Sequence, residues 1–185
     1  VYISELRDQE RHGDSLRFRA NLERVGMCLA LEMAQHWVYE PRKIQTPLGQ
    51  ADGVSLADQP VLAAILRSGL PMHEGMLRVF DKADSAFVSA YRKHQKGGEF
   101  EISIDYLSTP PLEGRTLVVI DPLLATGSSA TLVIKELLKH GTPDKIHIAC
   151  AIASVDGVSY VRDHLPPGTE IWAAAVDEET TAKGY

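Results

Sequence analysis

The chain has 185 residues, 44% of them hydrophobic, and a formal net charge of -6. This length predicts a single domain with a core large enough to fold without disulfides or a structural metal. The acidic balance argues against nucleic acid as a partner, because binding to its phosphates needs a basic face. No run of about 18 apolar residues occurs and no signal peptide is visible, so we expect no membrane association and a cytoplasmic location.

Two cysteines bear on the compartment of the protein. Cys28 lies in a helical pattern and Cys150 in an apolar run, so both are predicted to be buried thiols in a reducing compartment. Their spacing fits no zinc motif, and no histidine is paired with a carboxylate at metal-ligand spacing. The sequence therefore predicts no metal site built from protein ligands alone.

Residues 15–39 predict the first long helix. Its apolar residues recur at steps of three and four, which places them on one apolar stripe. The stripe consists of Phe18, Leu22, Val25, Leu29 and Met33. Pro41 is expected to end this segment, and residues 46–49 and 51–53 carry turn signals.

Short apolar segments then alternate with helical patterns along the rest of the chain. Strands are predicted at residues 61–66, 85–91, 116–120, 146–153 and 170–176. Helices are predicted at residues 70–80, 129–140 and 155–164, with Ser154 as the cap of the last. Apolar strands that alternate with helices predict an α/β fold with a doubly wound, mostly parallel sheet and helices on both faces.

A hairpin is predicted to project from that sheet. Residues 100–106 alternate between apolar and polar side chains, as in a half-exposed antiparallel strand. The polar, glycine-containing residues 93–98 precede them as a loop tip. We therefore expect one domain over residues 1–185, with a hairpin or flap at about 92–106.

The most informative motif follows the apolar residues 117–120. Asp121 ends this segment, and a loop of small residues leads into the next helix. In an open parallel sheet, ligands bind beyond the carboxyl ends of the strands, and the first N–H groups of a helix favour an anion. Residues 126–129 are thus placed to bind a phosphate, and Asp121 to bind ribose hydroxyls. On spacing alone, a second interpretation explains the motif equally well: Ser128 or Ser129 is an ordinary helix cap, and Asp121 only forms a turn.

Residues 121–129 resemble the signature loop of type I phosphoribosyltransferases, and that resemblance decides between the two interpretations. The family pattern is an apolar strand, two acids, two apolar residues, then Thr-Gly and small residues. Here Pro122 replaces the second acid, and Asp-Pro-Leu-Leu-Ala-Thr-Gly is typical of the uracil-specific branch. The resemblance implies that Asp121 is catalytic. It also implies that phosphoribosyl pyrophosphate is bound by Asp121, Pro122, Leu123, Leu124, Ala125, Thr126, Gly127, Ser128 and Ser129.

A second motif, at residues 66–70, resembles the pyrophosphate loop of the same family, with Ser68 in place of Ala and Pro71 in place of Gly. The guanidinium of Arg67 would offer a fixed fork of donors to pyrophosphate oxygens. Ser68 and Gly69 would let the backbone approach the same group. A surface ion pair is the alternative role for Arg67.

The third motif is Tyr91-Arg92, which resembles the strand end before the flexible hairpin of this family. The resemblance implies that Arg92 is catalytic and reaches the pyrophosphate when the hairpin closes. Lys93 and Lys96 follow it, and a solvated basic loop is favoured over a role in binding. For His73, on the helix after the second motif, we favour a structural role.

The resemblance implies a reaction of uracil with phosphoribosyl pyrophosphate that yields UMP and pyrophosphate. Mg²⁺ would be held mainly by the substrate's own oxygens. Leu123, Ala125 and Tyr185 would contact the base, and the chain would form a homodimer or an assembly of dimers. After Tyr185 the family pattern continues with Ile-Val-Pro-Gly-Leu-Gly-Asp-Ala-Gly-Asp, whose backbone reads the amide edge of uracil. We expect the sequence to stop short of this segment rather than to replace it.

Two rival functions remain open at this stage. A regulatory RNA-binding relative would keep the phosphate loop, but such proteins keep paired acids and a basic face. A transferase for a purine or for orotate would share the fold, but Pro122 disfavours it.

Overall fold

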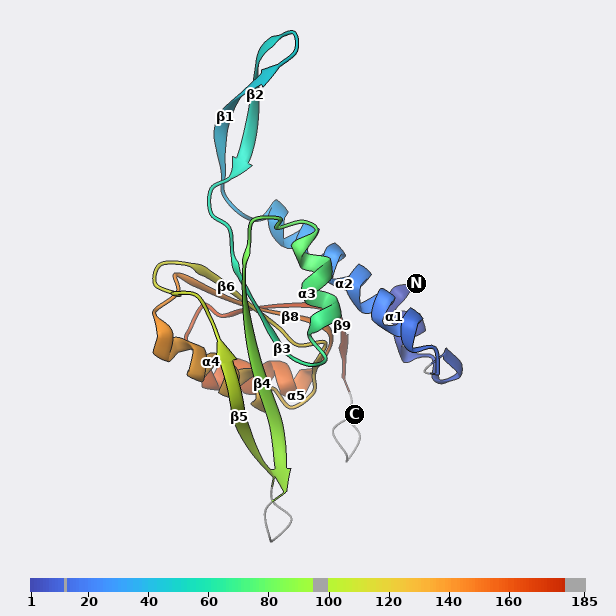
Figure 1. Ribbon diagram of the computed structural model, residues 1–185. Helices are drawn as coiled ribbons and strands as arrows, with labels where there is room; N and C mark the ends of the chain where they lie inside the picture. The colour runs from blue at the N-terminus through green and yellow to red at the C-terminus, as the bar shows by residue number, and fades with distance from the viewer. Residues whose placement is uncertain (12, 95–99, 179–185) are drawn as a thin grey trace.

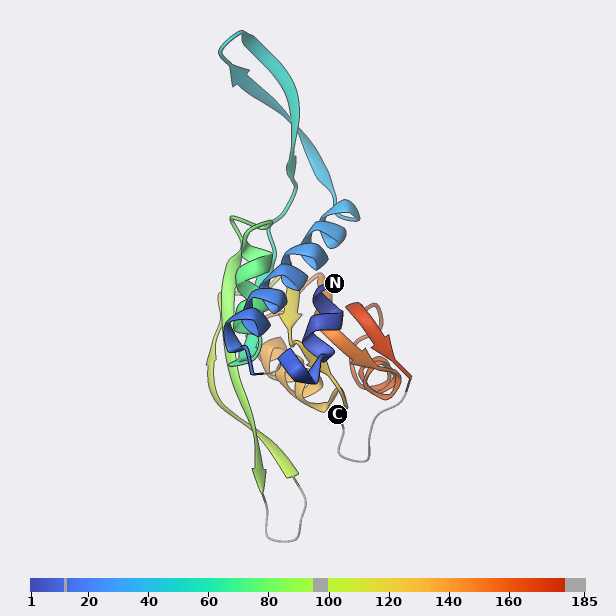
Figure 2. The same cartoon turned by 90° about the vertical axis from the view of Figure 1, so that its right-hand side faces the viewer.

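The computed structural model describes residues 1–11, 13–94 and 100–178, with the backbone alone at 91–94 and 100–102. Its centre is one mixed, mostly parallel sheet with helices on both faces, as predicted (Figures 1 and 2). The strands of this sheet, among the described residues, are β3 (Val61–Leu66), β4 (Asp84–His94), β5 (Phe100–Ser108), β6 (Thr116–Ile120), β7 (Leu123–Leu124), β8 (Lys145–Ser154) and β9 (Glu170–Asp177). They pair in the order β5-β4-β3-β6-β8-β7, and β9 also pairs with β8. All these pairs are parallel except β4 with β5.

Helices cover the two faces of the sheet in separate groups (Figure 2). One group consists of α1 (Tyr2–Arg7), α2 (Ser15–Gln35) and α3 (Leu70–Leu77), and the other of α4 (Ser128–Leu137) and α5 (Val155–His164). Two 3-10 turns, η1 (Gln9–Arg11) and η2 (Leu138–His140), extend α1 and α4. In the part of the chain that the structure describes, no helix has the length and apolar character needed to cross a membrane.

Alternation along the buried strands produces two cores, one on each face. In β3, Val61, Ala63 and Ile65 pack toward α4 and α5, whereas Leu62 packs toward α2 and α3. The same alternation occurs in β6, where Val119 and Ile120 lie in opposite cores. This arrangement explains why the strands appear in the sequence as continuous apolar runs.

The predicted elements of the sheet are confirmed, several with the same bounds. β3, β6 and α5 begin and end at the predicted residues, and Ser154 caps α5 as expected. The predicted hairpin corresponds to β4 and β5, whose antiparallel register pairs His94 with Phe100. The short strand β7 and the terminal helix α1 were not predicted.

The first long helix is shorter than predicted. α2 ends at Gln35 rather than near residue 39, because Trp37 leaves the helix to stack on Phe80 with ring centroids 4.7 Å apart. The predicted burial of Cys28 is wrong: it is exposed, one helical turn after the exposed Arg24 on the solvent side of α2. Cys150 is buried as predicted, and both cysteines are free thiols.

A two-stranded arm, β1 (Tyr39–Thr46) and β2 (Gly49–Leu56), projects away from the body (Figure 1). The turn signal at residues 46–49 connects its two strands, but the turn predicted at residues 51–53 is wrong, because these residues lie inside β2. The arm was not predicted, because both of its faces are largely exposed and its sequence therefore shows no alternation between buried and polar positions.

Candidate active site

Two of the loops selected from the sequence lie side by side at the carboxyl edge of the sheet. β3 and β6 are neighbouring parallel strands, with Ala64 paired with Ile120. The β3–α3 turn (residues 67–69) and the β6–α4 loop (residues 121–129) therefore leave the sheet at the same edge. A Cβ placed on Gly69 would lie 2.7 Å from the Ile120 carbonyl oxygen, so the two backbones are in contact there.

Gly127 sets the path of the β6–α4 loop into α4. Its φ of 72° lies in the left-handed region, and it occupies the N-cap position of α4. A Cβ at this position would lie 2.7 Å from the Gly157 oxygen, so conformation and space both require glycine. The alternative of a capping Ser128 or Ser129 is wrong, because both residues lie within the helix.

A small pocket opens over this loop and the start of α4. Its lining residues are Asp121, Leu123, Leu124, Ala125, Thr126, Gly127, Ser129 and Ala130. Next to it, the hydroxyls of Thr126 and Ser128 share a hydrogen bond of 2.7 Å. Hydroxyl donors and the first N–H groups of a helix form a favourable environment for a phosphate, because the helix dipole is positive at that end.

Asp121 supplies the carboxylate of this pocket. Its backbone N–H donates to the Ala149 oxygen at 3.1 Å, which holds the residue at the tip of β6. Burial raises the pKa of Asp121 to about 6, although a hydrogen bond from the Leu123 backbone works in the opposite direction. On the neighbouring strand, burial and then the charge of Asp121 raise the pKa of the Cys150 thiol to about 12. Cys150 is therefore a neutral core residue, and of these two groups Asp121 is the one whose pKa lies near the physiological range.

The β3–α3 turn presents Arg67 and Ser68 to solvent on the same edge of the sheet. The peptide bond between Leu66 and Arg67 is cis, which the sequence did not indicate. Gly69 donates its N–H to the Ile65 oxygen at 2.9 Å, and α3 begins at the next residue. Within the described residues Arg67 forms no ion pair, so the structure gives no support to the surface ion pair that was its alternative role.

The structural role favoured for His73 agrees with its contacts, and two tryptophans of the α2 and α3 core also have partners. His73 is buried, its Nε2 lies 3.0 Å from the Ser85 hydroxyl, and burial lowers its pKa. Trp172 donates its indole N–H to His147 Nδ1 at 3.2 Å, and both Trp37 and Trp172 pack against the α2 and α3 core. These residues stabilise the fold and take no part in the pocket.

Arg92 lies on β4 beyond the end of β3. Leu66, the last residue of β3, pairs with Ser89, and Arg92 follows three residues later, paired with Ile102. Its backbone thus continues past the carboxyl edge that carries the two loops. The side chains of Arg92 and Lys93 are outside the described part of the structure, as are Lys96 and Tyr185.

One contact of the β6–α4 loop was missed by the sequence analysis. The Ser154 hydroxyl donates a hydrogen bond to the Ala125 carbonyl, in addition to accepting one from the Gly157 N–H at 2.9 Å. A Cβ on Gly157 would lie 2.6 Å from the Leu124 oxygen and 2.7 Å from the Ala125 oxygen. The sequence indicated the capping role of Ser154 but contained no signal that this cap touches the loop.

Comparison with known proteins identifies the family. The model of the uracil phosphoribosyltransferase family matches residues 1–185. This chain belongs to the uracil phosphoribosyltransferase family. It is 45% identical to a uracil phosphoribosyltransferase of Porphyromonas gingivalis, with 100% of this chain and 85% of the relative aligned. A uracil phosphoribosyltransferase of Pyrococcus furiosus is 33% identical, over 99% of this chain and 78% of its own length.

Two solved structures have the same fold as this chain. The AQ2163 protein of Aquifex aeolicus matches with a TM-score of 0.87 and 29% identity, over 100% of this chain and 86% of that chain. A hypoxanthine phosphoribosyltransferase of Staphylococcus aureus matches with a TM-score of 0.58 and 12% identity, over 86% and 74% of the two chains. The second likeness is one of fold alone, and it supports the type I phosphoribosyltransferase architecture expected from the sequence.

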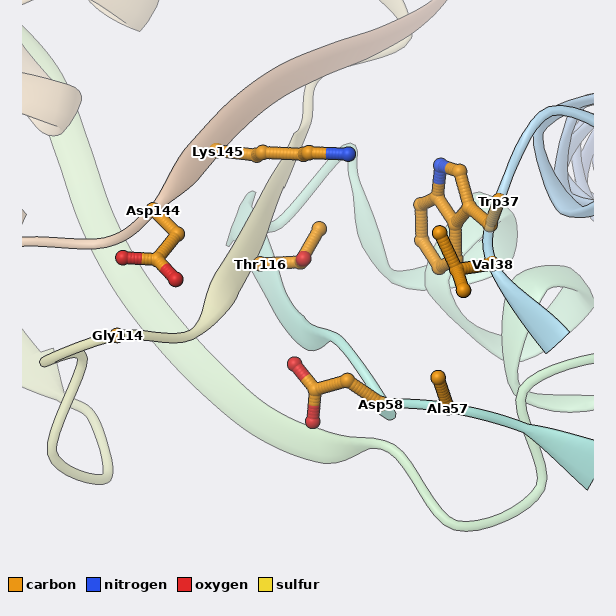
Figure 3. Close-up of a pocket in the computed structure, with 8 residues that line it drawn as sticks. All are labelled: Trp37, Val38, Ala57, Asp58, Gly114, Thr116, Asp144 and Lys145. Atoms are coloured by element: carbon orange, nitrogen blue, oxygen red, sulfur yellow. The ribbon is translucent and has the colours of Figure 1, made fainter. Parts of the chain in front are cut away.

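A larger pocket lies at the opposite edge of the sheet, near the amino ends of β3, β6 and β8 (Figure 3). Its volume is about 270 Å³, against about 30 Å³ for the pocket over the β6–α4 loop. Its lining residues are Trp37, Val38, Ala57, Asp58, Gly114, Thr116, Asp144 and Lys145. None of the residues that carry the family motifs lines it, and ligands of open parallel sheets bind at the carboxyl edge. The larger volume of this pocket therefore does not make it the active site. The small pocket over the β6–α4 loop is the candidate active site.

Proposed function

We propose that this chain transfers the phosphoribosyl group of phosphoribosyl pyrophosphate to uracil, producing UMP and pyrophosphate. The observation that carries the proposal is the contact of Gly69, in the β3–α3 turn, with Ile120 at the end of β6, directly before the β6–α4 loop. A substrate with phosphates at both ends of a ribose needs two anion sites about one sugar apart. Two adjacent loops at one sheet edge supply them, one with an arginine and the other with hydroxyls at a helix start.

Each end of the substrate has its own set of residues in this proposal. The 5-phosphate binds to the N–H groups and hydroxyls of residues 126–129, and the ribose hydroxyls bind to Asp121. The pyrophosphate binds to Arg67, the backbone of Ser68 and Gly69, and Arg92 once the β4–β5 hairpin closes. The exposure of Arg67 and Ser68, in the turn whose Gly69 contacts the end of β6, supports this assignment.

Catalysis then consists of positioning and electrostatic stabilisation. The bond between ribose C1 and the pyrophosphate oxygen breaks, and its electron pair leaves with pyrophosphate. Positive charge develops on the ribose, where the Asp121 carboxylate stabilises it, while Arg67 and Arg92 stabilise the departing anion. Uracil N1 forms the new bond to C1 and gives up its proton to solvent water. No protein nucleophile is required.

The chemistry of the site fits a Mg²⁺ ion bound mainly by substrate. In the described residues no group of three or more histidine, cysteine or acidic side chains is placed to hold a metal. Asp121 is the carboxylate that lines the small pocket. A single carboxylate together with phosphate oxygens and waters is the ligand set that Mg²⁺ prefers. Asp121 would contribute to holding the ion, which when bound would neutralise charge on the pyrophosphate.

The base is proposed to lie against Leu123 and Ala125. Leu123 is 42% exposed at the rim of the small pocket, although it is apolar, and Ala125 lines the same pocket with a small side chain. A planar base can cover such an exposed apolar surface. Tyr185 and the segment expected after it would complete the base site, but Tyr185 lies outside the described residues.

We further propose that the chain acts as a homodimer, with the β1–β2 arm in the interface. An isolated two-stranded hairpin is marginally stable in water. The register places Tyr39 and Leu56 opposite each other, and Pro41 opposite Val54, so these four side chains share one face. Tyr39 and Val54 are exposed there. A second copy of the chain that covers this apolar face would stabilise the arm.

Pyrophosphate release with different bases tests the proposed reaction. The chain, extended with the family segment expected after Tyr185, should release pyrophosphate in the presence of uracil and show little release with orotate, hypoxanthine or guanine. Release that requires a purine or orotate would identify a transferase of the same fold for another base. Absence of release with every base, together with specific RNA binding, would favour the regulatory relative.

A further inference from the structure

The start of α5 is packed directly against the back of the β6–α4 loop. The Ser154 hydroxyl donates to the Ala125 carbonyl, and Gly157 has so little space that a Cβ would lie 2.6 Å from the Leu124 oxygen. Ser154 is 5% exposed. Two consecutive carbonyls of the loop thus face α5, one through a hydrogen bond and one through close contact.

The direction of these carbonyls determines the direction of the adjacent N–H groups. In a planar trans peptide, the C=O and N–H bonds point in opposite directions. When the oxygens of Leu124 and Ala125 point toward α5, the N–H groups of Ala125 and Thr126 point away from it. The small pocket lies on that opposite side, since Ala125 and Thr126 line it and no described residue of α5 does.

We propose that Ser154 is a positioning residue for the 5-phosphate of the substrate. Its hydroxyl holds the peptide between Ala125 and Thr126 in the orientation that presents the Thr126 N–H to the anion. Gly157 allows α5 to approach closely enough for this bond to form. The inference rests on the proposed phosphoribosyl transfer for the identity of the anion, but the orientation of the peptide does not depend on which base is used.

Ser154 also caps α5, so a test must separate capping from positioning. Ser154→Ala removes both hydrogen bonds of the hydroxyl. Ser154→Gly removes the bond to Ala125 at a smaller cost to the helix, because glycine is a better N-cap than alanine. Ser154→Thr keeps a hydroxyl that can make both bonds. Asp14→Ala is the matched control, since Asp14 caps α2 through a 2.9 Å bond from the Arg17 N–H and lies outside the candidate site.

Binding of ribose 5-phosphate, measured by calorimetry on the full chain, is the primary readout. We expect Ser154→Ala and Ser154→Gly to weaken binding to a similar degree, by roughly tenfold, as for the loss of one oriented hydrogen bond. Ser154→Thr should recover most of the affinity, and Asp14→Ala should bind as the unmodified chain does. In turnover assays of the extended chain, the KM for phosphoribosyl pyrophosphate should rise while the KM for uracil stays constant.

Thermal unfolding of the same variants separates the two roles. If Ser154 acts only as a cap, affinity will follow stability, and Ser154→Gly will bind more tightly than Ser154→Ala. That result, or unchanged affinity in both variants, would overturn the inference. Failure of the extended chain to use uracil, with the dependence on Ser154 intact, would refute the proposed function and leave the positioning role standing.

Discussion

Gly69, in the β3–α3 turn, and Ile120, at the end of β6, are in backbone contact beside the candidate site. A Cβ on Gly69 would lie 2.7 Å from the Ile120 oxygen and 2.8 Å from the Ile65 oxygen, closer than real Cβ atoms approach such groups. The contact brings the β3–α3 turn against the end of β6, where Asp121 begins the β6–α4 loop. The geometry of one loop therefore constrains the geometry of the other.

Gly69→Ala should disturb both loops at once. The added methyl group must displace backbone rather than a flexible side chain, so we expect a loss of roughly 1–3 kcal/mol in unfolding free energy. Affinity for phosphoribosyl pyrophosphate should fall at least about tenfold, because the arginine and the carboxylate would no longer be aligned. Gly13→Ala is the control, since a Cβ there would meet nothing within 4 Å. Denaturant unfolding and calorimetry measure the two effects, and wild-type affinity in Gly69→Ala would show that the contact is not needed.

Ionisation of the buried Asp121 carboxylate should lower the stability of the folded chain. Its pKa in the folded chain, about 6, lies above the ordinary value, so the folded state binds the proton more tightly than the unfolded state does. The stability contributed by this group is therefore full below pH 4 and falls as pH rises through 6. Asp121→Asn cannot ionise, and at pH 7 it should unfold with a free energy higher by roughly 1–3 kcal/mol. The measurement is the difference in unfolding free energy between Asp121→Asn and wild type. A difference that is smaller at pH 7 than at pH 4 would contradict this prediction.

The same substitution should reduce activity in a pH-dependent way. The carboxylate is proposed to stabilise positive charge on the ribose, so kcat should fall roughly 10²-fold or more in Asp121→Asn. In the wild type, kcat/KM for phosphoribosyl pyrophosphate should rise with pH, with a midpoint near 6. The variant serves as the control for ionisation of the substrate, which titrates in both proteins. If the variant keeps full activity, or the same rise with pH, Asp121 is not the catalytic carboxylate.

The two arginines should each contribute to binding of the pyrophosphate. Arg67→Ala and Arg92→Ala should each weaken the affinity for phosphoribosyl pyrophosphate by roughly tenfold to a hundredfold, as for the loss of one charge-assisted partner. Arg78→Ala is the matched control, because Arg78 lies at the end of α3 in an exposed ion pair with Glu23. Calorimetry with Mg²⁺ present measures the affinities. Normal binding by a folded Arg92→Ala would refute closure of the hairpin over the pyrophosphate.

Phosphate binding and base binding should be separable. A chain ending at Tyr185 contains both loops and Arg92, so it should bind phosphoribosyl pyrophosphate with Mg²⁺ but show little turnover with uracil. Addition of the Pro-Gly-Leu-Gly-Asp-type segment should restore turnover, and Ala125→Leu should block it again by filling the base position. Strong turnover by the chain ending at Tyr185 would show that uracil is recognised elsewhere.

The arm should be required for association of two chains. Val54→Asp places a charge on the apolar face formed with Tyr39, and burial of an unpaired charge should weaken dimerisation at least about tenfold. Ala51→Asp adds the same charge on the opposite face of β2 and should have little effect. Sedimentation velocity over a range of concentrations distinguishes the outcomes. A wild-type chain that stays monomeric throughout would refute the proposed dimer.

The sequence by itself determined the strands of the sheet other than β7, and the positions of the two loops in the chain. Buried strands such as β3 and β6 are continuous apolar runs, and Asp121 and Arg67 follow them directly, so their place at one sheet edge could be inferred from the parallel topology. Local signals were also enough for the cap of α5 at Ser154. Where no such signal exists the prediction failed, as for the arm, whose two faces are both exposed.

Tertiary structure alone decided which backbones meet. The contacts of Gly69 with Ile120, Gly127 with Gly157 and Ser154 with Ala125 join residues far apart in the chain, and none of them leaves a periodic pattern in the sequence. The pKa of Asp121 likewise depends on burial by neighbouring strands rather than on adjacent residues. Periodicity reports which face of an element is buried, whereas the distance between two loops depends on how the strands and helices that carry them pack together.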